Sequence, residues 1–173
     1  MHLFAADMAD SDSLEKAAAE VAKVTQGVDY LIVNGAYLSV ESVRFHPSGF
    51  TGKAAALKRE MIDSLEVNVI GVIYSINALL PLVRKGTVKK IIVISTGMAD
   101  TEMVLKATVP GSVVYASMKA ATNMVVAKYA VELKEEGISI LALSPGVVNT
   151  HDQERKSSVS AYTKKAPLCL TVL

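Results

Sequence analysis

The chain has 173 residues, a length that suits one domain with a sizeable hydrophobic core. Its 18 basic and 17 acidic residues give a net charge of +1 and are scattered along the sequence, which argues against nucleic acid or an anionic membrane surface as a partner. The single cysteine, Cys169, excludes an internal disulfide, and the three histidines stand far apart, so we expect no metal site.

The longest apolar run, residues 67–83, does not have the character of a membrane span. It is interrupted by Asn68, Ser75 and Asn77, whereas a span needs ~20 predominantly apolar residues. We therefore interpret it as a buried helix. The first residues, MHLFAADMAD, do not form a basic leader followed by an apolar stretch, and we expect a cytoplasmic protein.

The first part of the sequence predicts a strand, a helix and a second strand. Residues 2–7 form a short apolar run that predicts a strand. Ser11 or Ser13 can cap the Ala-rich helix that follows and stops before Gly27. Residues 28–36, VDYLIVNGA, form a continuous apolar strand, which is typical of a sheet covered on both faces.

The remaining elements continue the same alternation. A long helix is expected over about 54–83, followed by a buried strand over 89–95 and an irregular loop over 96–112. A second long helix runs over about 113–136 and ends before a glycine, and residues 138–146 form the last buried strand. This order predicts an α/β fold with a parallel sheet and helices on both faces.

Ligands of such sheets gather at the carboxyl ends of the strands. These ends carry small or polar residues: Asp7, Asn34-Gly35-Ala36, Ser95-Thr96-Gly97 and Ser144-Pro145-Gly146. The same residue types also favour ordinary turns. Four such ends in one sheet favour a ligand site over turns alone.

Tyr115 and Lys119 are spaced as a proton-transfer pair would be. Four residues apart on a predicted helix, they share one face. The chain has six tyrosines and many lysines, so the Tyr-x-x-x-Lys pattern alone is a weak signal. A tyrosine has a reference pKa near 10, and a nearby ammonium favours the phenolate, which would suit an acid/base role for Tyr115. The alternative is two polar residues that happen to fall at helical spacing.

Five ordered segments of the sequence resemble the short-chain dehydrogenase/reductase family, over about residues 2–150. The strand end with Asn34 and Ala36 is similar to the family's Asn-Asn-Ala-Gly, with Gly35 and Tyr37 as departures. The segments that carry the resemblance are VDYLIVNGAY, VNVIG, IIVISTG, YASMKAATN and SPGVVNT.

The resemblance implies alcohol oxidation or carbonyl reduction with NAD or NADP as cofactor. Tyr115 would act as acid/base, and Lys119 would bias the tyrosine and bind the ribose hydroxyls of the cofactor. Thr96 or Ser95 would hold the substrate oxygen, and both remain candidates. Asn68 would support a water in a proton relay; the alternative is a buried amide whose hydrogen bonds are satisfied within the protein.

The same resemblance implies a set of cofactor contacts and an assembly. Asp7 and Met8 match a pair that holds the adenine, and the substrate would be a small alcohol or carbonyl compound. A homodimer or tetramer would form through the helices at 54–83 and 113–136. The implied cofactor-binding residues are Asp7, Met8, Asn34, Gly35, Ala36, Tyr115, Lys119, Pro145, Gly146, Val148 and Thr150.

The family's glycine-rich turn, Thr-Gly-x-x-x-Gly-x-Gly, does not occur in this sequence. We interpret residues 1–150 as a partial Rossmann-like, doubly wound parallel sheet that lacks the first two strands and this turn. Residues 151–173 would be a polar substrate-lid remnant and a short tail. The strand at 2–7 would slide beside the strand at 28–36, pair with another chain or lie poorly ordered.

Two functions of different kinds follow from these observations. The first is an NAD(P)-dependent oxidoreductase, inactive in this form if the cofactor has too few contacts. The second is a non-catalytic family remnant that serves as a binding or oligomerisation module. An enzyme acting on sugar nucleotides is a third and weaker alternative.

Overall fold

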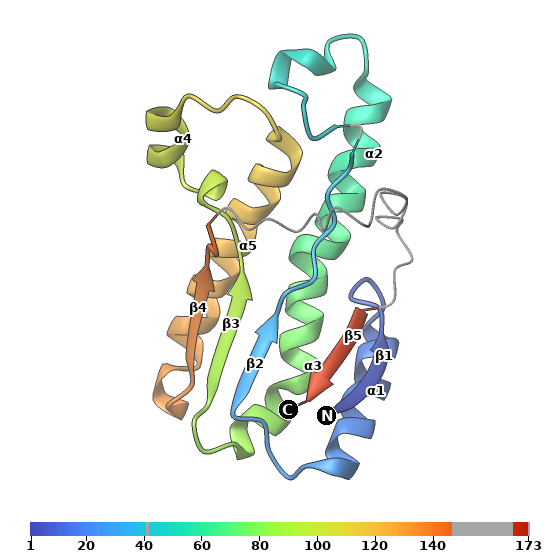
Figure 1. Cartoon of the computed structure of the whole chain (residues 1–173), viewed down its shortest axis with the longest axis vertical. Coiled ribbons are helices and arrows are strands. Elements are labelled where there is room, and N and C mark those ends of the chain that lie inside the picture. Colours follow the sequence, from blue (N-terminus) through green and yellow to red (C-terminus); the bar gives the residue numbers. More distant parts are fainter. Residues whose placement is uncertain (41, 147–167, 173) are drawn as a thin grey trace.

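The computed structural model describes residues 1–40, 42–146 and 168–172. Its strands are β1 (His2–Ala6), β2 (Tyr30–Val33), β3 (Lys90–Ile94), β4 (Ser139–Leu143) and β5 (Leu168–Val172) (Figure 1). Its α-helices are α1 (Ser11–Val24), α2 (Ala54–Leu65), α3 (Gly71–Lys85), α4 (Thr101–Ala107) and α5 (Val113–Glu132). Strands and helices alternate from β1 to β4 as the sequence predicts.

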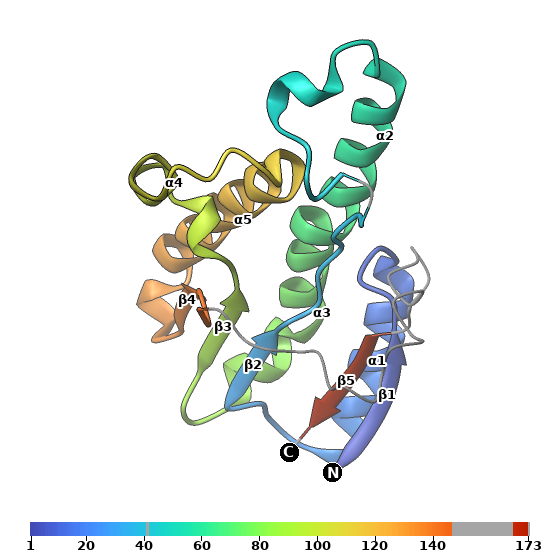
Figure 2. The same cartoon turned by 45° about the horizontal axis from the view of Figure 1, so that its top comes forward.

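The strands form two separate sheets. β2, β3 and β4 form a parallel sheet in that order, with Val33 opposite Val93 and Val93 opposite Ala142. This confirms the α/β class and the parallel sheet. β1 pairs instead with β5 in an antiparallel ladder that sets Ala5 opposite Cys169, and β5 lies between β1 and β2 (Figures 1 and 2).

The pairing of β1 differs from all three arrangements expected for it. An isolated strand leaves its backbone N–H and C=O groups unpaired, and the closing segment of the same chain supplies the missing partners. Residues 168–172 belong to a short apolar run after a polar stretch, a pattern that predicts a tail and not a strand.

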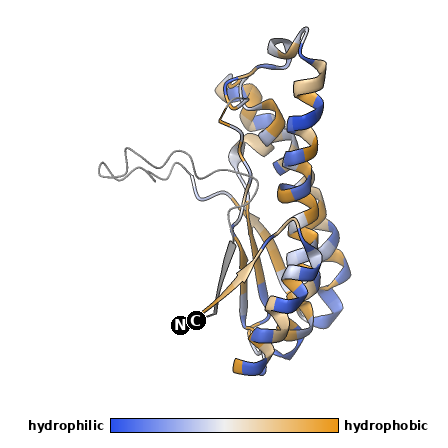
Figure 3. Ribbon diagram, turned by 90° about the vertical axis from the view of Figure 1, so that its right-hand side faces the viewer, coloured by the Kyte–Doolittle hydropathy of each residue, from blue (hydrophilic) through white to orange (hydrophobic). Residues whose placement is uncertain are grey.

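The long helices cover one face of the parallel sheet, not both as expected (Figure 3). Alternate residues of the strands therefore differ in burial: Ile91 and Val93 are buried, whereas Ile32 is 59% exposed and Leu141 is 48% exposed. The difference arises because α1 packs against α3 and joins the same hydrophobic core. The shared core residues of these helices include Ala18, Val21, Ile76, Leu79 and Val83.

Local sequence explains where α1 begins and which way it faces. Asp10, and neither Ser11 nor Ser13, is the N-cap: its side chain accepts hydrogen bonds from the backbone N–H groups of Asp12 and Ser13. Ser13 Oγ instead accepts from the N–H of Asp7, which fixes the turn after β1. The buried face has helical spacing and consists of Leu14, Ala17, Ala18 and Val21.

The predicted long helix is present as one continuous run, Ala54–Lys85, with a π-helical turn at Glu66–Ile70 between α2 and α3. By length and composition it could cross a membrane, but 56% of its most apolar window is buried inside the protein, as in a core helix. Gly71 begins α3 against the backbone of Met8. A Cβ at Gly71 would lie 2.8 Å from the Met8 carbonyl oxygen, so this contact requires glycine.

The segment at 96–112 is more regular than the loop expected there. It contains a 3₁₀ turn at Gly97–Ala99 and the short helix α4, capped by the Asp100 side chain, which accepts from the N–H of Met103. Pro110 and Gly111 favour an irregular loop, and the capping side chain of Asp100 outweighs that signal over residues 101–107. α4 and the segment before α2 flank the beginning of α5 at one end of the molecule (Figure 2).

Candidate active site

Helix α5 carries four polar residues that meet three other elements. Tyr115, Lys119, Thr122 and Asn123 follow one another at spacings of four, three and one residues, which keeps them on adjoining sides of the helix. The helix begins directly after Ser112, a residue in the left-handed conformation (φ 59°) whose Oγ donates a hydrogen bond to the Val43 carbonyl. The start of α5 is thus tied to the loop after β2.

Lys119 is the largest fully buried side chain of the described residues, at 1% exposure. Its Nζ donates a hydrogen bond of 2.7 Å to the carbonyl oxygen of Ile94, the last residue of β3. Burial disfavours the charged amine and lowers the pKa of Lys119 to about 8. Two of the three ammonium protons are still free to bind other acceptors.

The Tyr115 ring lies on the same side as this amine. The Lys119 Nζ is 5.8 Å from the ring centroid, so the two groups share one side of α5 as their spacing predicts. Burial raises the pKa of Tyr115 above its usual value of 10. Burial, and not the expected lowering by the Lys119 ammonium, therefore sets the direction of the Tyr115 pKa shift.

The two hydroxyl candidates at the end of β3 have different surroundings. Ser95 is buried, and its Oγ donates a hydrogen bond of 2.6 Å to Asn123 Oδ1 on α5. Thr96 is partly exposed, and its Oγ1 accepts from the N–H of Met98. The Ser95 proton is engaged within the protein, whereas Thr96 keeps its proton available, which favours Thr96 as the substrate-facing hydroxyl.

Asn68 lies in the π-helical turn and is fully buried, at 0% exposure. Its Nδ2 donates to the Tyr37 carbonyl and to Ser64 Oγ, both at 2.8 Å, and its Oδ1 accepts from the Tyr37 N–H at 2.9 Å. Its own carbonyl accepts a hydrogen bond of 2.6 Å from Thr122 Oγ1. These contacts support the alternative of a satisfied amide that positions the loop after β2.

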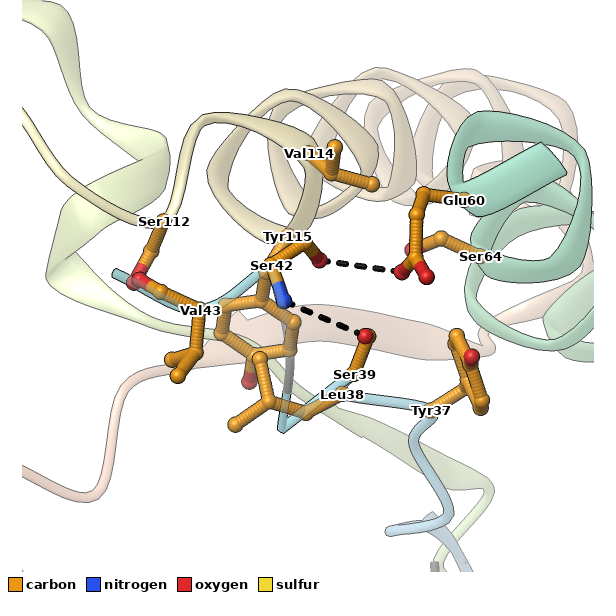
Figure 4. Close-up of a pocket in the computed structure, with 10 residues that line it drawn as sticks. All are labelled: Tyr37, Leu38, Ser39, Ser42, Val43, Glu60, Ser64, Ser112, Val114 and Tyr115. Atoms are coloured by element: carbon orange, nitrogen blue, oxygen red, sulfur yellow. Dashed lines mark hydrogen bonds between the residues drawn. The ribbon is translucent and has the colours of Figure 1, made fainter. Parts of the chain in front are cut away.

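A small polar pocket lies beside Tyr115, between α2, the start of α5 and the loop after β2 (Figure 4). Glu60 is the charged residue of this pocket, and its Oε2 accepts a hydrogen bond from Ser42 Oγ at 2.9 Å. Glu60 and Ser64 are not among the residues predicted from the sequence. Their spacing with Asn68, at i, i+4 and i+8 on one helix face, is the signal that could have revealed them.

The ends of the parallel strands do meet at one edge. The Gly97 N–H donates to Ser144 Oγ at 3.1 Å, which joins the ends of β3 and β4. The residues predicted to contact the cofactor are exposed or partly exposed here: Asn34, Gly35, Ala36, Pro145 and Gly146.

The other predicted cofactor residues have different positions. Asp7 Oδ1 accepts from the Ala9 N–H, and the Met8 side chain is buried in the core against Gly71. Val148 and Thr150, and residues 151–167 of the predicted lid, lie outside the described residues. The described residues contain no group of three or more histidine, cysteine, aspartate or glutamate side chains that could hold a metal ion.

The model of the short-chain dehydrogenase family matches residues 1–160. The chain belongs to this family. Among curated proteins it is 45% identical over 152 residues to the short-chain dehydrogenase/reductase atnB of an Arthrinium species, covering 87% of this chain and 57% of that protein. It is 40% identical over 154 residues to the short-chain dehydrogenase/reductase AacuF of Aspergillus aculeatus, covering 88% of this chain and 57% of that protein.

Solved structures of two reductases share the fold. The NADPH-bound carbonyl reductase from chicken fatty liver superposes with a TM-score of 0.63 at 22% identity, over 82% of this chain and 56% of that chain. An enoyl-(acyl-carrier-protein) reductase of Anaplasma phagocytophilum in complex with NAD gives a TM-score of 0.69 at 21% identity, over 90% of this chain and 53% of that chain. The chain thus spans little more than half the length of these relatives.

Proposed function

We propose that the protein acts as an NAD(P)-dependent oxidoreductase that interconverts an alcohol and a carbonyl compound. The observation that supports this best is the placement of Lys119: a buried amine, directed at the end of β3 and on the same side of α5 as the Tyr115 ring. The family membership and the oxidoreductase relatives support the same reaction class.

In this proposal Tyr115 gives a proton to the developing alkoxide during reduction and takes it back during oxidation. Thr96 donates a hydrogen bond to the substrate oxygen, because its proton is not engaged by the protein. Lys119 keeps positive charge beside the phenol, since a pKa of about 8 leaves the amine mostly protonated at neutral pH. Asn68 and Ser95 position the surrounding backbone and helix.

The described residues fit one half of a dinucleotide cofactor. The two free ammonium protons of Lys119 suit ribose hydroxyls, and the exposed backbone after β2 and β4 adjoins them at the sheet edge. No described glycine-rich turn precedes a helix at this edge, so the pyrophosphate half has no cradle among the described residues. A bound nicotinamide cofactor would supply the hydride.

Dinucleotide binding separates the enzyme from a non-catalytic module. NADH or NADPH fluorescence is titrated with this chain and with a form extended upstream of Met1, with thermal shift as a second readout. Binding by either form supports the proposal. Saturating dinucleotide without effect on either form contradicts it and favours the module.

We also propose that copies of the chain associate through α2, α3 and α5. Apolar side chains on these helices face solvent: Ile62 on α2, and Met124 and Val131 on α5, which are 61% and 77% exposed. Small residues between them, Ala120 and Ala127, allow close helix approach. Light scattering after size exclusion should give a dimer or tetramer, and a V131E variant should shift the mass toward the monomer.

A further inference from the structure

Helix α4 follows Thr96 closely in the sequence but buries none of its own side chains. Two of its apolar residues are open to solvent, Met103 at 43% and Leu105 at 78% exposure. Neither belongs to the hydrophobic core of the described residues. A helix of seven residues is too short to be stable by itself in water, and helices in proteins are stabilised mainly by packing of an apolar face. The apolar surface of α4 is therefore only partly covered in the part of the chain that the structure describes.

The position of α4 places this surface at the ligand edge of the sheet. The helix lies beyond the carboxyl ends of β3 and β4 (Figures 1 and 2), where parallel sheets bind their ligands. The 3₁₀ turn Gly97–Ala99 directly follows Thr96 and contacts both α4 and α5, the helix that carries Tyr115. α4 therefore adjoins the residue that holds the substrate oxygen in the proposed reaction.

Met103 is the α4 residue whose side chain reaches this strand end. A Cβ at Gly97 would lie 2.5 Å from Met103 Sδ and 3.0 Å from its Cε, so the thioether rests on the Gly97 backbone. Gly97 is the neighbour of Thr96, and consecutive Cα atoms are about 3.8 Å apart. The apolar end of Met103 is thus about one residue away from Thr96, and part of its surface remains open to a ligand.

The other exposed side chains of α4 do not share this side of the helix. Glu102 and Lys106 pair with each other on another side, and their side chains are both 75% exposed. Leu105 lies two positions after Met103 and projects from roughly the opposite side, since successive residues turn by about 100°. The surface that α4 presents beside Thr96 is therefore a methionine, a flexible side chain that adapts to apolar ligands of different shapes.

We propose that Met103 forms an apolar wall of the substrate site, and that the substrate is an alcohol or carbonyl compound with a hydrophobic group next to the reacting carbon. The substrate oxygen binds Thr96, and an alkyl chain covers the Met103 thioether. This inference rests on the proposed function for the reacting end of the substrate. Binding of the apolar group, however, is measurable without turnover.

The test is the binding of two ketones to the full chain labelled with ¹³C at the methionine methyl groups. Octan-2-one has four more methylene groups than butan-2-one, and burial of one methylene strengthens binding up to about fourfold. The Met103 methyl signal, assigned by its loss in Met103→Leu, should shift with octan-2-one at a Kd at least about tenfold below that for butan-2-one. The signal of Met124, an exposed methionine on α5, should not shift.

Three substitutions locate the effect, with isothermal titration calorimetry as the measure of each Kd. Met103→Gln puts a polar amide in place of the thioether and should remove most of the preference for octan-2-one. Met103→Leu keeps an apolar side chain and should keep the preference, as should Leu105→Gln on the opposite side of the same helix. Equal binding of the two ketones, an unmoved Met103 signal, or an unchanged preference in Met103→Gln would overturn the proposal.

The outcome is separable from that of the oxidoreductase proposal. Turnover of ketones with the same kcat/KM for butan-2-one and octan-2-one would support the oxidoreductase function and overturn the apolar wall. Octan-2-one bound at Met103, without hydride transfer from bound NADH or NADPH, would support the apolar wall and contradict the oxidoreductase function.

Discussion

Replacing the buried Lys119 with methionine should stabilise the protein. The pKa of Lys119 falls from 10.5 to about 8 because of burial, and this difference corresponds to about 3 kcal/mol lost at neutral pH by keeping the amine charged in the folded state. Methionine removes the charge but leaves the Ile94 carbonyl without its donor, which costs about 1–2 kcal/mol. We expect a net gain of about 1–2 kcal/mol, or ~2–8 °C in Tm.

The pH dependence gives this prediction its direction. Between pH 8 and pH 10.5 the unfolded chain holds the Lys119 proton more tightly than the folded protein, so the stability of the wild type rises with pH in that window. The advantage of Lys119→Met should therefore be largest at pH 7 and shrink toward pH 10. Urea unfolding followed by circular dichroism at pH 7, 8, 9 and 10 measures both effects.

A control variant isolates the buried charge. Lys106→Met removes an exposed lysine that pairs with Glu102 on α4, and it should leave stability and its pH dependence nearly unchanged. A Lys119→Met protein that is less stable than the wild type, by an amount that does not vary from pH 7 to pH 10, would refute the reasoning. A stable but inactive variant would also show that this lysine is retained for function.

Two further substitutions test the packing around the site. Gly71→Ala should destabilise the protein by about 1–3 kcal/mol because its Cβ would meet the Met8 backbone. Gly97→Ala should cost less than about 1 kcal/mol, since its Cβ would meet the flexible end of the Met103 side chain. Equal losses of stability in denaturant unfolding would contradict this difference. Thr122→Val should cost about 1–3 kcal/mol of stability by leaving the Asn68 carbonyl unpaired in the core. Thr122→Ser, which keeps the hydroxyl, should cost clearly less. Similar losses of stability in both variants would show that this hydrogen bond does not cause the effect.

The sequence predicted those features that depend on local pattern. The apolar runs and their helical or strand character placed β1 to β4, α1, α5 and the long helix, which was expected over about 54–83. The four-residue spacing placed Tyr115 and Lys119 on one side of a helix. The order of strands and helices gave the parallel sheet. Each element can be recognised from residues that are close together in the sequence, and the order of the elements then indicates the sheet type.

Features that depend on distant contacts were not predictable in this way. The antiparallel partner of β1 comes from residues 168–172, at the other end of the chain, and no local pattern indicates that pairing. The position of α1 on the same face as α3 depends on the core that the two helices share, which includes Val21, Ile76 and Val83. Glu60 joins the site through a loop that is distant in sequence, although its spacing with Asn68 on the helix was visible.

Hydride transfer is the most direct test of the central claim that Tyr115 is the acid/base of a dehydrogenase site. NADH and NADPH consumption with a panel of small ketones and aldehydes compares the wild type with Tyr115→Phe, in the longest form that binds the dinucleotide. Tyr129→Phe is the matched control, because Tyr129 lies on the same helix and donates its hydroxyl proton to Asn77. We predict a loss of about 10²–10⁴-fold in Tyr115→Phe and little change in Tyr129→Phe. Equal turnover in Tyr115→Phe and the wild type, or no turnover by a wild-type protein with bound dinucleotide, would contradict the account.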